Sequence, residues 1–462
     1  MASIRARESS DGYATTRQRA SRSVPRWTTA GGLWLLGGAN AAFIIALWLR
    51  GGGIAQVHTA GELWTSVGRI TGLLGAYLLL IQVFLLVRFP PLERLVGFDR
   101  LTVWHRLNGK ICLGLILAHV VLITVGYAMM DRISLPAEAS ALLTNYPGMV
   151  TATVGTVLLV LVLVSSLVIV RRRLRYEAWY GVHLMAYAGI VFGWFHQIPT
   201  GNEFITNQPA AMYWTGLYLA TLALLVLFRL AHPTLRAFWH RLRVAEVTVE
   251  SANVVSVRLT GTHLDRLNAH AGQFFLWRFL GAGRWWESHP FSLSAVPDGR
   301  SLRITIKNVG DFTRHIGALR PGTAVVAEGP FGIFTAAARR HDNAVLIAGG
   351  IGITPIRALL EEMSGELILI YRVLSEDDLV FRDELEQLAR RRVIALHYVV
   401  GDHRAAGAER LLSAEHLREM VPDIRQRDIY ICGPPAMADL IEKHVQRTGA
   451  PRTSIHIERF AL

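Results

Sequence analysis

The sequence is short of cysteine, and its N-terminus is short of apolar residues. Two cysteines occur in 462 residues, Cys112 in an apolar run and Cys432 near the C-terminus, so we expect no disulfide framework. Residues 1–30 are basic and polar, which excludes the apolar core of a signal peptide and predicts a disordered cytoplasmic tail.

Long apolar runs are abundant. Hydrophobic residues make up 52% of the chain, and six runs are each about long enough to cross a bilayer: 33–49, 64–87, 104–127, 149–170, 179–196 and 211–230. The run from Val150 to Val170 is almost free of polar groups. After residue 243 the apolar runs shorten to strand length. The sequence therefore predicts a six-helix membrane domain over 31–232, followed by a soluble half.

The net charge of +13 is compatible with nucleic-acid binding, but the positions of the arginines are not. They gather in the tail and again near 88–100, 171–175 and 236–243, whereas the loops on the other side hold few. Cytoplasmic loops of membrane proteins carry such an excess of Lys and Arg. We therefore expect a multi-pass protein of the plasma membrane, with both termini in the cytoplasm and no nucleic-acid partner.

Four histidines lie within two of the apolar runs. His119 follows His105 by fourteen residues and His196 follows His183 by thirteen, in each case about 20 Å along a helix. Ionisable rings in a bilayer core are costly and usually serve a function. Two rings at two depths on each of two helices would hold two haem b groups, with His105 opposite His183 and His119 opposite His196.

This pattern leaves alternatives open. A spacing of fourteen residues keeps two rings within about 40° on a helix, whereas thirteen separates them by about 140°. The fifth helix must therefore distort, for example at Gly181, Gly189 or Gly193, or present the two haems at different angles. Membrane histidines also hydrogen-bond neighbouring helices or relay protons in transporters, and a haem spectrum separates these cases.

One arginine stands inside the second apolar run. Arg69 lies about one turn into the expected helix, at the outer side of the membrane. Its side chain either anchors the helix at the interface or places a positive charge beside the outer haem.

Residues 244–338 predict a small antiparallel β-barrel that binds FAD. Apolar and polar residues alternate in short runs at 244–249, 254–259, 274–279, 302–306 and 324–327, separated by Gly and Pro. Two motifs offer an aromatic ring for the flavin, and hydroxyl and backbone N–H groups for its phosphates. The expected FAD-binding residues are His289, Pro290, Phe291, Ser292, Lys307, Gly310, Phe312 and Thr313.

Residues 339–462 predict an α/β domain that binds NADPH or NADH. A buried strand at 344–348 leads into a glycine turn and then a helix, as a dinucleotide phosphate site requires. Further strands at 367–371, 393–400 and 428–431 alternate with helical stretches, which predicts a doubly wound parallel sheet. The expected binding residues in the turn are Gly349, Gly350, Gly352, Thr354 and Pro355, the last in place of a third glycine.

Taken in order, these motifs resemble one family. Residues 64–230 resemble the membrane domain of ferric reductases and NADPH oxidases. Residues 244–462 resemble a ferredoxin reductase-type dehydrogenase, with the motifs HPFS, GDFT, EGPFG at 328–332, GGIGITP, and CGPP at 432–435. Within the family, the likeness is greatest to bacterial NADPH oxidase homologues.

The resemblance implies roles for further residues of the dehydrogenase. Cys432, Gly433 and Pro434 would contact the nicotinamide end of the coenzyme. Phe460 would cover the flavin ring until nicotinamide displaces it, and Arg372 would bind the 2′-phosphate of NADPH.

In the membrane domain the resemblance places Arg69 near the outer haem. Animal oxidases keep an aromatic residue midway along the fifth helix, where this chain has Gly189. No calcium-binding loop or partner-docking tail is apparent, so we expect constitutive activity without an obligatory protein partner.

The expected function is that of a transmembrane NAD(P)H oxidase. Electrons would pass from cytoplasmic NAD(P)H to FAD, to the inner haem, to the outer haem and to an external acceptor. By resemblance this acceptor is O2, which gives superoxide. The alternatives are reduction of a ferric chelate or a quinone, and electron relay to a periplasmic partner that docks on loop 128–148.

Overall fold

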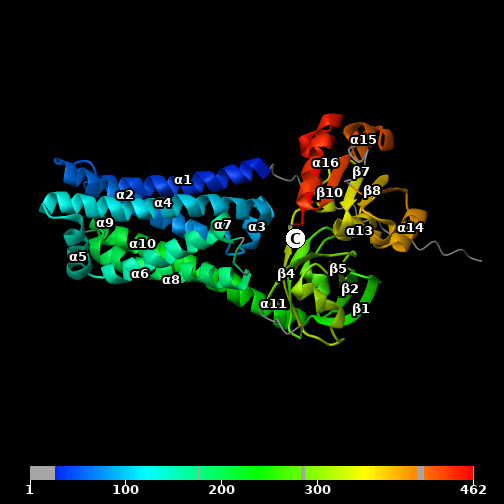
Figure 1. The fold of residues 1–462 in the computed structure, drawn as a ribbon, viewed down its shortest axis with the longest axis horizontal. Helices are drawn as coiled ribbons and strands as arrows, with labels where there is room; N and C mark the ends of the chain where they lie inside the picture. Colours follow the sequence, from blue (N-terminus) through cyan, green and yellow to red (C-terminus); the bar gives the residue numbers. More distant parts are fainter. Residues whose placement is uncertain are drawn as a thin grey trace, which may run out of the picture.

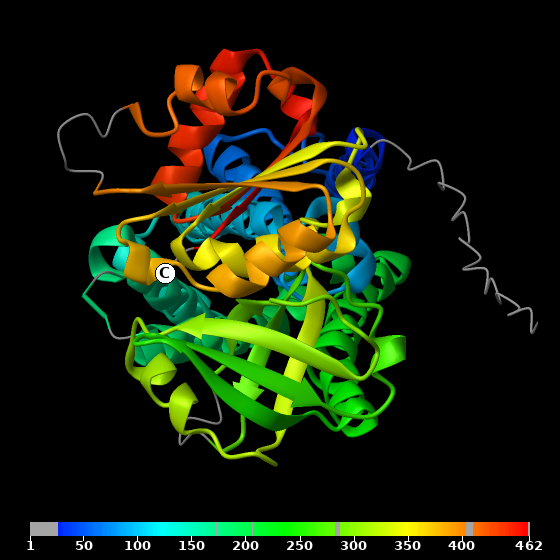
Figure 2. The same cartoon turned by 90° about the vertical axis from the view of Figure 1, so that its right-hand side faces the viewer.

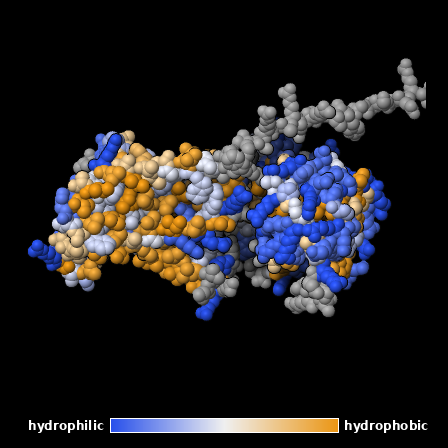
Figure 3. Space-filling model, turned by 90° about the horizontal axis from the view of Figure 1, so that it is seen from above, coloured by the Kyte–Doolittle hydropathy of each residue, from blue (hydrophilic) through white to orange (hydrophobic). Residues whose placement is uncertain are grey.

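The computed structural model describes residues 26–171, 173–174, 176–205, 207–281, 287–402 and 410–460. Long helices form the N-terminal part, and β-sheets with shorter helices form the C-terminal part (Figure 1). Apolar surface covers the helical part and hydrophilic surface covers most of the other (Figure 3). Residues 1–25 of the predicted tail lie outside the described residues.

Six long helices contain the six apolar runs of the sequence, wholly or for the most part. They are α1 (Arg26–Arg50), α2 (Ala60–Leu85), α4 (Phe98–Asp131), α6 (Met149–Ser166), α8 (Tyr176–Thr200) and α10 (Gln208–Val226). Within the described ranges, five helical segments are long and apolar enough to cross a membrane, and α8 is not among them. Histidine, tryptophan and tyrosine residues lower the hydropathy of α8, so the sixth crossing stays a prediction.

The apolar run from Val150 to Val170 is not one helix. α6 ends at Ser166, Leu167 adopts an extended conformation, and the four-residue helix α7 (Val168–Arg171) follows. The span that the sequence predicts here is present but ends at Ser166, four residues earlier than the apolar run. Other short helices that the apolar pattern did not predict are α3 (Pro90–Val96), α5 (Leu135–Asn145) and α9 (Asn202–Ile205).

The last membrane helix continues beyond the bilayer toward the C-terminal part. α10 passes through a π-helical turn (Leu227–Ala231) into α11 (His232–His240), so 33 residues are helical without a break. At 1.5 Å per residue this is about 50 Å, longer than a hydrocarbon core of about 30 Å. The C-terminal end of α11 therefore extends out of the hydrocarbon region.

Glycines let the helices of the bundle approach closely. α2 packs along α4, and α6 packs along α8. A Cβ atom on Gly155 of α6 would lie 2.7 Å from the carbonyl oxygen of Gly189 on α8. Small residues permit such backbone contact between membrane helices. Gly189 thus serves the packing of α8 on α6.

Residues 243–331 form two three-stranded antiparallel sheets. Isolated bridges from Arg243 to Ala324 and from Leu293 to Ile304 join the edges of the two sheets, and buried aromatic and aliphatic side chains lie between them. The first sheet has the order β1 (Arg243–Ser251), β2 (Val254–Thr260), β5 (Ser301–Lys307), and the second β4 (His289–Ser292), β3 (Phe274–Phe279), β6 (Val325–Phe331). Strand β4 is the HPFS motif itself, which the alternation of residues did not predict as a strand.

The remaining strands form one parallel sheet with helices on both faces (Figure 2). Its order is β11 (Ile455–Arg459), β10 (Asp428–Gly433), β7 (Ala344–Gly349), β8 (Leu367–Val373), β9 (Ile394–Val400). From β7 the chain continues to β8 and β9 on one side, and from β10 it continues to β11 on the other, so a topological switch point lies between β7 and β10. Ligands bind beyond the carboxyl ends of the strands at such a point. The helices are α13 (Ile353–Glu362), α14 (Arg382–Arg391), α15 (Ala414–Met420) and α16 (Pro435–Thr448).

A cluster of ion pairs joins the antiparallel sheets to the parallel sheet. Arg303 of β5 donates hydrogen bonds of 2.8 and 3.0 Å to Glu384 of α14, and Arg357 of α13 lies 2.9 Å from the same carboxylate. Burial by itself would raise the pKa of Glu384, but the hydrogen bonds and charges of the two arginines outweigh it and lower that pKa. The cluster fixes how the antiparallel sheets and the parallel sheet face each other.

Candidate functional site

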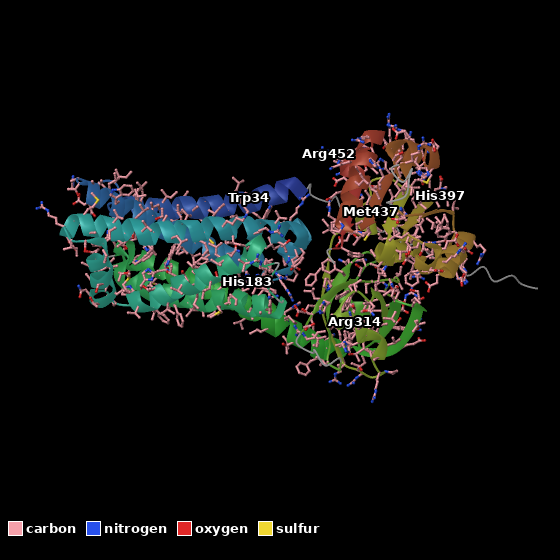
Figure 4. The ribbon with its side chains drawn as sticks, in the orientation of Figure 1. Trp34, His183, Arg314, His397, Met437 and Arg452 are labelled. Atoms are coloured by element: carbon pink, nitrogen blue, oxygen red, sulfur yellow. The ribbon has the colours of Figure 1, made fainter. Side chains whose placement is uncertain are left out.

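The four membrane histidines form two pairs between α4 and α8. The ring centroids of His105 and His183 are 6.1 Å apart, and those of His119 and His196 are 6.4 Å apart. This is the pairing that the sequence predicts. His183, labelled in Figure 4, lies in the half of the bundle nearer the β-sheets. We therefore call His105 and His183 the inner pair, and His119 and His196 the outer pair.

The spacing of the rings fits bis-histidine metal ligation. Two metal–imidazole bonds of about 2 Å on opposite sides of one iron place the ring centroids about 6 Å apart. Nδ1 of His105 lies 3.1 Å from the carbonyl oxygen of Gln82, and Nδ1 of His119 lies 2.8 Å from that of Gly68. A ring held at Nδ1 presents Nε2 to a metal, so backbone carbonyls of α2 orient both α4 histidines for ligation.

The thirteen-residue spacing on α8 does not break the helix. α8 is continuous from Tyr176 to Thr200, so its two histidines leave the helix at different angles, and both still meet their partners on α4. Of the two explanations that the sequence leaves open, the structure favours different angles. Between the two levels the space is filled by the buried side chains of Leu79, Cys112, Leu113 and Leu159.

A cavity of about 310 Å³ adjoins the outer pair and is lined by Arg69, His119 and His196. Nε of Arg69 donates to Glu203 Oε1 (2.8 Å), and Nη2 donates to the carbonyl oxygen of Gly51 (3.0 Å). The Glu203 side chain is 3% exposed. Arg69 is therefore paired with a buried carboxylate, and the role of its positive charge beside an outer haem stays a prediction.

Sequence reasoning missed two residues of this region. Glu203 is the only acidic residue between Gln197 and Ala210, a signal that points to it as the partner of Arg69. Gln197, next to His196, accepts hydrogen bonds from Trp214 Nε1 (2.7 Å) and the Tyr218 hydroxyl (3.1 Å). No signal in the sequence indicates these hydrogen bonds of Gln197.

The two predicted flavin motifs lie side by side. The ring of His289 stacks on Phe312 with centroids 3.8 Å apart, and it lies parallel to Phe291 at 6.4 Å. The hydroxyl of Ser292 is buried and has no hydrogen-bond partner among the described residues. Strand β4 thus carries aromatic rings and an unpaired buried hydroxyl, groups that a planar, hydrogen-bonding cofactor could use. Pro290 is exposed in the same strand.

Three other residues expected at the flavin are engaged within the protein. The hydroxyl of Thr313 accepts hydrogen bonds from the backbone N–H groups of Val309 and Gly310, at 2.9 and 3.0 Å, and so closes the turn. Nζ of Lys307 lies 3.8 Å from Oδ1 of Asp378, across the junction with the parallel sheet. Contact of Lys307, Gly310 or Thr313 with a phosphate stays a prediction.

The glycine turn and the CGPP motif meet at the switch point of the parallel sheet. A Cβ atom on Gly352 would lie 2.3 Å from the carbonyl oxygen of Cys432, and one on Gly433 would lie 3.2 Å from Cα of Gly349. Glycine is therefore required for the two turns to touch. Gly350 has a φ of +51°, which also favours glycine.

The residues that follow these turns are held by local contacts. The Thr354 hydroxyl donates to the Ile351 carbonyl oxygen (3.1 Å), and Pro355 lies buried in the first turn of α13. Pro434 precedes the first turn of α16. Met437, labelled in Figure 4, packs against Gly349 and Gly433 from that helix.

Cys432 and Phe460 lie on the core side of this site. Cys432 is completely buried, and burial followed by the charge of Glu458 raises the pKa of its thiol. The backbone N–H of Phe460 donates to the Gly433 carbonyl oxygen (3.2 Å), and its ring packs against the core that contains Cys432. Direct chemistry at the thiol is disfavoured, whereas Phe460 lies beside the turn where nicotinamide is expected.

Arg372 is less available than the sequence suggests. Its side chain is buried at the carboxyl end of β8, where Nη1 donates to the carbonyl oxygens of Val373 and Val399, the latter at 3.2 Å. Burial lowers the pKa of the guanidinium, and the charge of Asp402 opposes this. The backbone contacts use only Nη1, so Nε and Nη2 are the groups that could meet a 2′-phosphate, and that contact stays a prediction.

Family models match three consecutive parts of the chain. Residues 71–194 match a ferric reductase-like transmembrane component, residues 239–334 an FAD-binding domain, and residues 346–443 an oxidoreductase NAD-binding domain.

Similar proteins share the dehydrogenase pattern. Ferredoxin–NADP reductase B of Sorangium cellulosum is 28% identical over 37% of this chain and 77% of its own length. The sulfhydrogenase 2 gamma subunit of Pyrococcus furiosus is 30% identical over 36% of this chain and 63% of its own. The solved FAD/NAD-binding domain of a Vibrio cholerae nitric oxide dioxygenase is 24% identical, covers 48% of this chain and 98% of that domain, and has a TM-score of 0.41.

The order of the matched parts agrees with the order of the structural parts. Helices α2 to α8 coincide with the transmembrane component, the antiparallel sheets with the FAD-binding domain, and the parallel sheet with the NAD-binding domain. The chain is therefore an oxidoreductase with the architecture of the NADPH oxidases and ferric reductases, in which a multi-pass membrane domain is fused to FAD- and NAD-binding domains.

Proposed function

We propose that this protein carries electrons from NAD(P)H through FAD and two haems across the plasma membrane, and that the acceptor is O2, which is reduced to superoxide. The proposal rests on the two imidazole pairs, whose ring centroids are 6.1 and 6.4 Å apart. The other half of the chain matches FAD-binding and NAD-binding oxidoreductase domains. Histidines that relayed protons would not need this matched spacing at two depths.

The dehydrogenase residues bind and orient the two nucleotides. Gly349, Gly350 and Gly352 let the coenzyme pyrophosphate approach the backbone N–H groups at the start of α13, where the helix dipole favours an anion. His289 and Phe291 contribute flat surfaces for the flavin. When bound, FAD accepts a hydride and releases electrons one at a time, as haem iron requires.

The membrane residues hold the two haems at fixed depths. His105 and His183 would ligate the inner haem, and His119 and His196 the outer one, while α2 carbonyls fix the α4 rings. The proposed orientation puts the dehydrogenase in the cytoplasm. The membrane potential then changes the free energy of moving one electron outward by about 2.3 kcal/mol per 100 mV. Across an inside-negative membrane this change favours the transfer.

The outer haem would lie in the cavity of about 310 Å³ at the outer pair, because His119 and His196 both line it. A small acceptor such as O2 could react at the edge of a haem held there, beside Arg69 and Thr65 of the same lining. Among the described residues there is no group of three or more His, Cys, Asp or Glu side chains that could hold a metal ion, which weakens the case for a dedicated iron site. The match to a ferric reductase-like component nevertheless keeps ferric-chelate reduction as the second candidate.

The test is acceptor-dependent NAD(P)H oxidation by the purified full-length protein, together with its optical spectrum. We expect low-spin bis-histidine haem, O2 consumption, and reduction of a superoxide probe that superoxide dismutase abolishes. Negligible O2 consumption with rapid reduction of ferric citrate would replace the oxidase assignment with the reductase one. A protein purified without haem, after supplementation during expression, would contradict both.

A single substitution tests the outer pair. His119→Ala should halve the haem content and abolish reduction of the external acceptor, while flavin reduction by NAD(P)H continues, because the inner pair and the dehydrogenase are untouched. Haem content is measured as the pyridine haemochrome per flavin. The matched control is His58→Ala, since His58 is exposed at the end of a loop. Equal haem content in the two variants would show that His119 is not a ligand.

A further inference from the structure

A second cavity, of about 960 Å³, lies where the bundle meets the antiparallel sheets. α8, α10 and α11 form one wall, and β3 and β6 form the other. Figure 1 shows α11 leading from the bundle into the dehydrogenase at this junction. The cavity therefore lies at the membrane surface on the dehydrogenase side.

Arginines dominate the polar part of this cavity. Five of them line it, against the single carboxylate of Glu328: Arg88, Arg229, Arg241, Arg243 and Arg278. Arg88 pairs with Glu328, and Arg278 lies 3.9 Å from the same carboxylate. Burial, with the nearby charge of Arg229, lowers the pKa of Arg88 to about 9. Glu93 also lies near Arg88 and Arg229, so two carboxylates face five arginines and the cluster keeps a net positive charge that would stabilise an added anion.

The rest of the wall is apolar and open toward the lipid. Leu184 of α8 is 41% exposed, and Leu230 and Phe238 on the last helix are 63% and 72% exposed. Trp239 follows at 51%, a residue type that favours the headgroup level of a membrane. Exposed apolar side chains directly beside an arginine cluster match the two ends of an amphiphile.

We propose that this cavity binds an anionic phospholipid from the leaflet that faces the dehydrogenase. The phosphate would lie against Arg229 and Arg241, because guanidinium groups pair with phosphate in a bidentate manner. The acyl chains would lie along Leu184, Leu230 and Phe238. A free phosphate would leave this apolar wall uncovered, and the cavity is far larger than one phosphate group.

The lipid would join the bundle to the dehydrogenase. Arg229 and Arg241 come from the last helix, whereas Arg243 and Arg278 come from β1 and β3 on the opposite side. An anion held between them bridges two elements of like charge that otherwise repel. The proposal does not rest on the identity of the electron acceptor.

The experiment compares lipid binding by the full-length protein and three variants. Detergent-purified protein is titrated with phosphatidylglycerol or phosphatidylcholine, and bound lipid is counted by native mass spectrometry alongside thermal stability. Arg229→Gln/Arg241→Asn removes two phosphate contacts, and asparagine tolerates the left-handed conformation of Arg241 (φ +43°). Ala237→Trp fills the cavity without a change of charge. Arg50→Gln, on an exposed residue at the far end of α1, is the charge control.

We expect the unaltered protein and Arg50→Gln to retain phosphatidylglycerol in preference to phosphatidylcholine. Arg229→Gln/Arg241→Asn should bind it about tenfold more weakly, as expected when charge-assisted contacts worth about 1.4 kcal/mol are lost. Ala237→Trp should weaken binding by at least as much because its ring occupies the cavity, and all variants should keep FAD. Unchanged phosphatidylglycerol binding in the cavity variants overturns the proposal. So does loss of FAD in place of lipid, because the cavity would then belong to the flavin site. Equal protection by inorganic phosphate would overturn the role of the acyl chains.

Discussion

Arg69 and Glu203 show at the residue scale how a partner changes the expected role of a side chain. The Arg69 side chain is 17% exposed and that of Glu203 is 3% exposed. Removing one partner of a buried pair leaves the other charge unpaired, at a cost of about 3–5 kcal/mol. We predict that Arg69→Ala and Glu203→Ala each lower the melting temperature of the purified protein, and that Arg69→Met/Glu203→Leu recovers most of the loss.

The kinetic expectation for Arg69 follows from the same pair. Because Glu203 compensates its charge, Arg69→Ala should slow the reduction of O2 and of a bulky dye by similar factors. A selective loss of O2 reduction with unchanged melting temperature would restore the hypothesis of a cation that acts on superoxide. Arg50→Gln again serves as the control, since Arg50 is exposed.

Arg372 gives a second prediction at this scale. Its guanidinium ties the carboxyl ends of β8 and β9 together through the Val373 and Val399 carbonyl oxygens. Arg372→Ala should therefore lower thermal stability and raise KM for NADPH and NADH by similar factors. The measurement is the ratio of kcat/KM for the two coenzymes. A fall in that ratio of about tenfold or more, the effect of about 1.4 kcal/mol, would instead assign the 2′-phosphate to Arg372.

Strands β10 and β11 are linked by a buried carboxylate. Asp428 accepts hydrogen bonds from His456 Nε2 (2.9 Å) and from the backbone N–H groups of Arg340 (2.7 Å) and His341 (2.6 Å). Burial by itself would raise the pKa of Asp428, but these hydrogen bonds outweigh it and lower the pKa below its ordinary value. The loop before β7 and strand β11 therefore depend on the ionised carboxylate.

The sign of the pH effect follows from that lowered pKa. The stability from Asp428 is fully present above the unfolded value of about 3.9 and is lost as the pH falls toward the folded pKa. We predict that Asp428→Asn lowers the melting temperature at neutral pH, and that its difference from the unaltered protein shrinks as the pH falls from about 4 to about 2. A difference that stays constant over this range would exclude ionisation as the cause.

The whole molecule works only if the dehydrogenase stays aligned with the bundle. Phe98, the first residue of α4, stacks on Phe331 at 6.2 Å and contacts Phe274 at 6.4 Å, so the helix that carries His105 touches both β6 and β3. Arg236 of α11 donates to the Gly329 carbonyl oxygen at the same junction. These contacts set the separation between the flavin motif and the inner histidine pair.

Loosening this junction should slow haem reduction without slowing flavin reduction. We predict that Phe98→Ala leaves the rate of flavin reduction by NAD(P)H unchanged and slows the following haem reduction, as measured by stopped-flow absorbance. Phe43→Ala, which removes a 47% exposed ring from α1, is the control and should change neither rate. If Phe98→Ala slows flavin reduction as much as haem reduction, the ring supports the fold of the dehydrogenase instead of its alignment.

Patterns with a local cause were predictable from the sequence. Apolar runs gave the long helices because a bilayer requires about twenty apolar residues, and alternation gave β1, β2, β3 and β5 to within two residues. β4 and β11 were missed because HPFS reads as a turn and IHIER is short and polar. The break at Leu167 was not predicted, although Ser165 and Ser166 directly precede it and serine pairs occur at helix kinks.

The sequence by itself determined the histidine pairing and the glycine turns, because helical rise and backbone sterics act between neighbours in the chain. Tertiary structure decided what the charged side chains do. Arg69 meets Glu203 across 134 residues, and Arg303 meets Glu384 across 81, so no local pattern records either contact. It also decided that Arg372 faces backbone carbonyls and that arginines from the last helix and from β1 and β3 share one cavity. Electrostatic partners depend on burial and on distance in space, and only the folded chain sets both.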